Sequence, residues 1–190
     1  MIDSRRGTIS LIIAIVTGFA IELATNSVGN DAALLKLGAL PDNGQLNGEL
    51  WRIATYSFLP FNWLHLLLNV GVLWWIGRIV EQQVGIGRGA LIYFVSVICS
   101  AAVILLVHSW YPKDGATVGA SGGVFGLLGA ALLISYRENG SDRSRRLLWV
   151  VLLVGFAVSL LPDISMAGHT GGILGGIPTA LFVKVRQNEA

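Results

Sequence analysis

Two side chains in this sequence could together perform nucleophilic catalysis. Ser121 stands in GASGGVFG (119–126), and His169 stands in GHTGGILGG (168–176). A serine hydroxyl attacks a carbonyl when a base takes its proton, and histidine has a suitable pKa for that transfer. The serine could instead only cap a helix, and the histidine could only make hydrogen bonds within a helix bundle. The pair therefore predicts acyl transfer if the fold brings the two side chains together.

A second pair could stabilise the charge that such an attack creates. His65 and Asn69 are four residues apart in WLHLLLN, and so share one face of an apolar helix. Buried in an apolar helix, the asparagine needs a partner, and its amide could donate to an oxyanion. A hydrogen bond between helices is the alternative for this asparagine.

The composition indicates that these residues work in a membrane. Of the 190 residues, 54% are hydrophobic and 13% charged, and the mean hydropathy is +0.69. No polar block is long enough for a second globular unit, so we expect one domain over 1–190. The single Cys99 and the absence of zinc spacing predict no disulfide framework, metal or cofactor. The net charge of +2 is scattered through short loops, so no nucleic-acid surface is expected.

Six apolar segments are candidates for membrane-spanning helices, so we predict an all-α, polytopic six-helix bundle. Several are shorter than the usual length of about 20 residues. A signal peptide is the alternative for the first segment, but five further segments follow it. The long connection 25–62 holds NDAALLKLGAL, a possible amphipathic helix. The six segments are 8–24, 63–80, 89–111, 121–136, 147–161 and 168–185.

The basic residues alternate between the connections and predict an orientation. By the positive-inside rule, both termini should be cytoplasmic and the connection 25–62 should face outward, in the inner or plasma membrane. The second, fourth and sixth segments then run inward, which places His65, Ser121 and His169 toward the outer face. The inner connections hold Arg5, Arg6, Arg78, Arg88, Arg137, Arg143, Arg145, Arg146, Lys184 and Arg186, and the outer ones hold Lys36, Arg52 and Lys113.

Small residues could bring two of these segments into close contact. The fourth carries Gly122 and Gly126, and the sixth carries Gly172 and Gly176, each pair in a GxxxG pattern. Phe125, one turn beyond the serine, could pack on the imidazole or could equally face lipid. At about 24 Å, the fourth segment is shorter than a hydrocarbon core of roughly 30 Å. The serine should therefore lie below the outer surface.

A third catalytic group is not evident. Asp114 and Asp163 lie in short loops with no clear route to His169, so a Ser-His dyad is predicted. Residues 119–123 also match the GxSxG elbow of soluble hydrolases. That motif requires a preceding strand, and six helical segments argue against it.

Four motifs, taken in order, resemble those of the rhomboid intramembrane serine proteases. They are ELWR at 49–52, HLLLN at 65–69, GASGGVFG at 119–126 and GHTGGILGG at 168–176. Each motif alone is weak, but their order along nearly the whole chain is specific. The resemblance implies a six-helix core and a serine endopeptidase. It also implies that the enzyme cleaves transmembrane protein substrates in or near their spans, within the lipid bilayer.

The resemblance also implies roles for individual residues. Ser121 would be the nucleophile and His169 the base, while His65, Asn69 and the backbone N–H of Ser121 would form the oxyanion hole. Many members carry a histidine five residues before the one matching His65, where this chain has Pro60, so loop detail and substrate preference need not carry over. Supporting or structural roles would fall to Gly119, Gly122, Phe125, Gly172, Gly176, Trp51, Arg52 and Glu81.

Two other functions fit part of the sequence. A pseudoprotease that binds membrane proteins through the same scaffold would be expected to lack Ser121 or His169, and this chain has both. A small transporter could use broken, Gly-rich helices. Beyond Glu22 and the histidines, however, the apolar segments hold almost no ionisable groups for ion coupling. The sequence does not name the substrate, the cleavage site or the oligomeric state.

Overall fold

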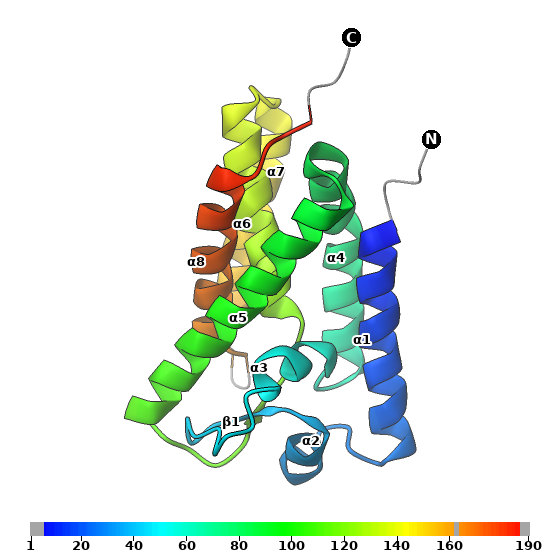
Figure 1. Cartoon of the computed structure of the whole chain (residues 1–190), viewed down its shortest axis with the longest axis vertical. Coiled ribbons are helices and arrows are strands. Elements are labelled where there is room, and N and C mark those ends of the chain that lie inside the picture. The colour runs from blue at the N-terminus through cyan, green and yellow to red at the C-terminus, as the bar shows by residue number, and fades with distance from the viewer. Residues whose placement is uncertain (1–5, 162–163, 187–190) are drawn as a thin grey trace.

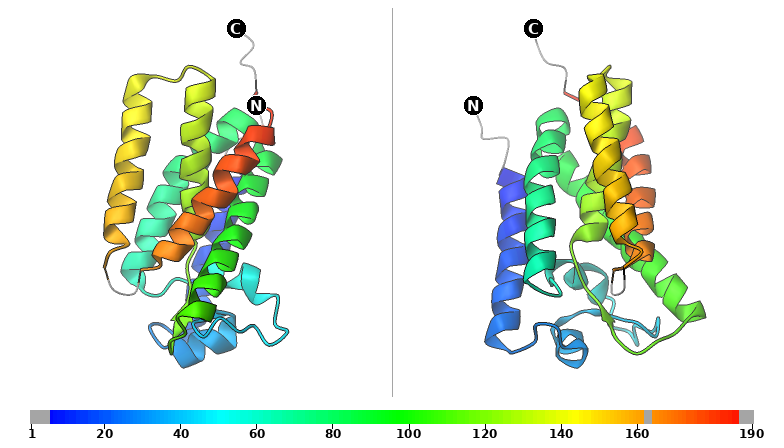
Figure 2. Two further views of the ribbon diagram at one scale, coloured as in Figure 1. Left: turned by 90° about the vertical axis from the view of Figure 1, so that its left-hand side faces the viewer. Right: turned by 180° about the vertical axis from the view of Figure 1, so that it is seen from behind.

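The computed structural model describes residues 6–161 and 164–186, and it is a bundle of six long helices with a smaller layer at one end (Figure 1). Helices α1 and α7 lie on opposite sides of the bundle, as the turned views in Figure 2 show. The six helices are α1 (Arg6–Ala24), α4 (Trp63–Val84), α5 (Ile86–Trp110), α6 (Ser121–Arg137), α7 (Asp142–Val158) and α8 (Met166–Phe182).

Each long helix matches one predicted segment, and the differences at the ends have local causes. Helix α7 was predicted over 147–161 but begins at Asp142, because the Ser141 side chain accepts from the Ser144 N–H and starts the helix in a polar turn. Helix α8 likewise begins before 168, since the Ser165 side chain accepts from the Gly168 N–H. Hydropathy locates the apolar part of a helix, and caps decide where it begins.

Length and hydropathy together qualify three of the described helices as membrane-spanning: α1, α4 and α5. Helix α6 is apolar but shorter, as the sequence predicts. It is buried along most of its length, between α4, α5, α7 and α8. The outer faces of the bundle carry exposed Leu67, Leu153 and Leu181, which suit contact with lipid.

The connection between α1 and α4 forms the layer at one end of the bundle. Its first helix lies within the NDAALLKLGAL segment, where Asn30 caps the amino end and Gly38 ends the helix with φ +116°. The second strand comes from the connection before α6 and pairs antiparallel with the first, with Leu40 opposite Thr117. The layer comprises α2 (Asp31–Leu37), β1 (Leu40–Pro41), α3 (Arg52–Thr55), the 3₁₀ helix η1 (Tyr56–Phe58) and β2 (Ala116–Thr117).

Glu81 joins the opposite ends of two helices. Its carboxylate accepts hydrogen bonds from the N–H of Gly7 and of Thr8, both at 2.9 Å, and from the Thr8 hydroxyl at 2.7 Å. These N–H groups belong to the first turn of α1, where the positive end of the helix dipole favours a carboxylate. Glu81 therefore fixes α1 against α4 and has a structural role.

Replacing Glu81 with alanine should lower the free energy of unfolding by on the order of 3 kcal/mol, because buried donors lose a charged acceptor. Thermal denaturation in detergent, followed by circular dichroism, would measure the change. Glu138→Ala is the matched control, because that side chain is exposed beyond α6 and should cost less than about 0.5 kcal/mol. Equal melting temperatures for the two variants would contradict the capping role of Glu81.

Candidate active site

The segment before α6 is tied to the layer formed by α2, β1, α3, η1 and β2, here called the end layer, and this fixes where the helix begins. The Thr117 hydroxyl donates to Asp42 Oδ1 at 2.6 Å, and the Gly119 N–H donates to the Tyr56 carbonyl at 2.9 Å. His108 Nδ1 also lies 3.2 Å from Asp42 Oδ1. The sequence patterns assign no functional role to His108 or Asp42, so this cluster emerges from the structure.

Ser121 is the first residue of α6. The residue at the cap position is Ala120, and no side chain makes a capping hydrogen bond to this helix. The Ser121 hydroxyl is therefore not used as a helix cap. The serine is half-buried. The N–H groups of the first turn and the positive end of the helix dipole surround this position, which suits a developing oxyanion.

His65 lies against the chain just before this helix. Its Nδ1 accepts from the Phe61 N–H at 3.2 Å, so in the neutral ring the proton is on Nε2. A Cβ on Gly119 would lie 2.8 Å from Nε2, and Gly119 has φ +129°, which glycine adopts without strain. Gly119 thus leaves room for the imidazole, whose Nε2–H donor lies at the approach to α6.

Asn69 is buried one turn further along α4. Its side-chain N–H donates to the His65 carbonyl at 2.8 Å, within the same helix, so this bond does not join two helices. An amide carries two N–H donors, and the second remains for another acceptor. His65 and Asn69 therefore present donors on one face of α4.

His169 is 5% exposed and lies in the second turn of a glycine-rich helix, α8. The Phe125 ring is stacked on the imidazole with centroids 3.9 Å apart and an interplanar angle of 7°. Of the two alternatives for Phe125, the structure has the packed one. The ring of Phe156, from α7, packs edge-on against the Phe125 ring, with centroids 5.4 Å apart.

The glycines of α6 and α8 bring Ser121 and His169 to the same level. A Cβ on Gly172 would overlap the backbone of Gly122, and a Cβ on Gly176 would overlap that of Gly126. The close approach continues toward the amino ends of the two helices, because a Cβ on Gly122 would lie 3.5 Å from the Gly168 carbonyl oxygen. These last two residues are the immediate chain neighbours of the serine and the histidine.

The hydrogen bond that the structure gives to the imidazole goes to Ser159 rather than to Ser121. Ser159 follows α7, and its Oγ lies 2.5 Å from His169 Nδ1. No pattern in the sequence singled out this residue. Its one signal was a hydroxyl at the end of an apolar run, which hydropathy alone cannot separate from a lipid-facing position.

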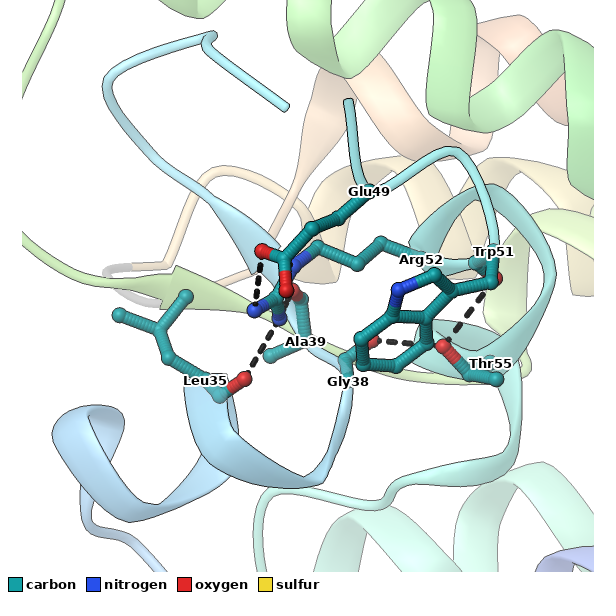
Figure 3. Close-up of polar contacts among 7 residues, drawn as sticks. All are labelled: Leu35, Gly38, Ala39, Glu49, Trp51, Arg52 and Thr55. Carbon is teal, nitrogen blue, oxygen red and sulfur yellow. Dashed lines mark hydrogen bonds and ion pairs between the residues drawn. The ribbon is translucent and has the colours of Figure 1, made fainter. Parts of the chain in front are cut away.

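Trp51 and Arg52 belong to the end layer, and Figure 3 shows their contacts there. The Arg52 guanidinium donates to the carbonyls of Leu35 and Ala39 at 2.5 and 2.8 Å, pairs with Glu49 at 2.8 Å, and lies 4.8 Å from the Trp51 ring centroid. Arg52 therefore satisfies carbonyls at the end of α2 and holds the layer together. Its role is structural.

The part of the chain that the structure describes contains no evident set of metal ligands. No group of three or more His, Cys, Asp or Glu side chains there could hold a metal ion. The polar side chains named above, toward the amino ends of α4, α6 and α8, are a hydroxyl, two imidazoles and an amide. Their chemistry is that of proton transfer and hydrogen bonding.

Residues 47–186 match the Rhomboid domain. The chain is 34% identical over 168 residues to "Rhomboid protease GluP" of Bacillus subtilis (strain 168), and the matched region covers 83% of this chain and 31% of the relative. It is 35% identical over 157 residues to "RHOMBOID-like protein 5" of Arabidopsis thaliana, covering 80% and 50%. It is also 30% identical over 132 residues to "Inactive RHOMBOID-like protein 8" of Arabidopsis thaliana, covering 67% and 36%.

The chain belongs to the rhomboid family, and it is a membrane protein with an all-α fold. It spans a third to a half of the length of the relatives named here. Because one of these is named inactive, family membership alone does not decide whether a chain is an enzyme. The side chains at the site must carry that argument.

Proposed function

We propose that this protein is an intramembrane serine endopeptidase that hydrolyses a peptide bond in or near the transmembrane segment of another membrane protein. One observation supports the proposal most strongly: α6 and α8 approach closely at Gly122 and Gly168, the chain neighbours of Ser121 and His169, so the hydroxyl and the buried imidazole lie near the amino ends of two closely packed helices. The name of the B. subtilis relative, a rhomboid protease, supports the same reading.

In the proposed reaction, Ser121 Oγ bonds to the substrate carbonyl carbon while His169 takes the hydroxyl proton. The oxyanion is stabilised by the backbone N–H of Ser121 and by side-chain donors of His65 and Asn69. The imidazolium then gives its proton to the leaving amide nitrogen, and the C–N bond breaks. Water attacks the acyl-enzyme with the same histidine as base and releases the new carboxylate.

The orientation of the chain in the membrane is part of the proposal. The start of α1 and the end of α8 lie at one end of the bundle, and the end layer lies at the other (Figure 1). Of the 12 Lys and Arg residues that the structure describes, nine lie in the helix halves or loops nearer the first end. By the positive-inside rule, the termini are cytoplasmic in the cell membrane, and water reaches Ser121 from outside.

The substrate must expose a carbonyl that a helix normally hides. We therefore propose that the substrate span unwinds near its outer end, where small or helix-breaking residues lower the cost. Purified protein in vesicles should cleave a reporter span containing a Gly-rich outer turn at least about tenfold faster than a poly-Leu span, because each Gly costs about 1 kcal/mol of helix stability.

Ser121→Ala in the same vesicles separates this cleavage from that of a contaminating protease, and should leave both reporters intact. Equal cleavage rates for the two reporters would contradict the unwinding step. Equal cleavage by wild type and Ser121→Ala would contradict the enzyme itself. The protein would then be a binding scaffold, in line with the relative that is named inactive.

A further inference from the structure

The hydroxyl of Ser159 has two neighbours, and together they define where its proton goes. Ser159 Oγ lies 2.9 Å from the Gly155 carbonyl oxygen of its own helix and 2.5 Å from His169 Nδ1. A carbonyl oxygen can only accept, and the hydroxyl has a single proton. Both contacts are therefore hydrogen bonds only when the hydroxyl donates to Gly155 and its oxygen accepts from His169.

The direction of this bond determines the tautomer of the imidazole. If Ser159 Oγ accepts, Nδ1 of His169 carries the proton, and in the neutral ring Nε2 has the free lone pair. A histidine that accepts a proton from a serine must present such a lone pair. Ser159 and His169 are each 5% exposed, so water competes little for this bond.

The end of α7 also restrains the ring in a second way. A Cβ on Gly155 would lie 3.2 Å from Cε1 of the Phe125 ring and closer still to Cζ. This glycine therefore leaves room for the ring that stacks on His169. Phe156 meets the same ring edge-on. One turn of helix thus supports the stacking partner through Gly155 and Phe156, and binds the imidazole edge through Ser159.

We propose that Ser159 is the positioning residue of the base: it holds His169 with Nδ1 protonated, so that Nε2 faces the proton of Ser121. The consequence for catalysis rests on the proposed function, whereas the tautomer itself rests only on the hydrogen bonds of Ser159. In serine hydrolases with a triad, a carboxylate fills this place. A neutral hydroxyl orients the ring without burying a charge in an apolar bundle.

The test combines a spectroscopic and a reactive readout on the purified full chain in detergent. In protein labelled with ¹⁵N-histidine, the ring nitrogen shifts report which nitrogen carries the proton, and His169→Ala assigns the His169 signals. The rate of covalent labelling by a fluorophosphonate probe reports the reactivity of Ser121. The variants are Ser159→Ala, which removes the acceptor, and Ser159→Thr, which keeps it. Ser109→Ala is the matched control, an exposed serine whose hydroxyl donates within its own helix.

Wild type, Ser159→Thr and Ser109→Ala should show His169 with Nδ1 protonated and should label within about threefold of one another. Ser159→Ala should show a mixture of tautomers or the Nε2-protonated form. Its rate of fluorophosphonate labelling should be lower than that of wild type by roughly tenfold or more. A structural role alone would not move the tautomer in a protein that still melts at the wild-type temperature.

Wild-type protein with His169 protonated on Nε2, or Ser159→Ala with an unchanged tautomer and labelling rate, would overturn the proposal. Failure of the proposed function gives a different pattern, in which wild type does not label at all. In that case the ¹⁵N spectra of wild type and Ser159→Ala still decide whether Ser159 holds the tautomer.

Discussion

Alanine at Ser121 or at His169 is expected to lower kcat/KM for cleavage of a transmembrane reporter by on the order of 10⁴-fold or more. The double variant is expected to be no worse than either single variant. The physical reason is that a nucleophile and its base act as a unit. Without the imidazole, the hydroxyl keeps its proton, and without the hydroxyl, the base has no proton to take.

The measurement is the initial rate of reporter cleavage by the three variants in detergent, with melting temperatures to show that each is folded. Ser109→Ala again serves as the serine control and should keep the wild-type rate. Losses that multiply in the double variant would mean that Ser121 and His169 act independently, and the dyad would be wrong. A large residual rate in His169→Ala would point to another base, and His65, which lies against Gly119, is a candidate.

Much of this architecture was predictable because the chain is apolar. A membrane span needs a run of hydrophobic residues, and such runs located all six long helices. Small residues at a spacing of four predicted the close approach of α6 and α8, because close packing in lipid depends on small side chains. Gly122 and Gly172 are in contact for that reason.

The end layer and the contacts at the last turn of α7 were not predictable in the same way. Asp42 binds Thr117 across 75 positions of sequence, and Ser159 meets His169 across a loop, and neither contact leaves a periodic pattern. Arg52 could be singled out only through the family resemblance, and the structure explains it by the carbonyls of α2. Polar contacts made by loops depend on the whole fold, whereas apolar periodicity is local.

Adding one methyl group at the crossing of α6 and α8 should strongly lower the stability of the protein. In Gly172→Ala, the new Cβ would overlap the carbonyl oxygen, the carbonyl carbon and the Cα of Gly122. These are backbone atoms, so they cannot rotate away. The helices must separate, at a cost on the order of 3 kcal/mol. The ends that carry Ser121 and His169 would separate with them.

Gly71→Ala is the matched control, because Gly71 is also within a helix but a Cβ there would meet nothing within 4 Å. Alanine favours helix over glycine, so this control should be neutral or more stable by up to about 1 kcal/mol. Thermal denaturation in detergent compares the two variants. At a temperature where both are folded, fluorophosphonate labelling should fall in Gly172→Ala alone. If Gly172→Ala is as stable and as reactive as Gly71→Ala, the glycine crossing does not set the distance between the hydroxyl and the imidazole, and the observation that carries the proposed function is lost.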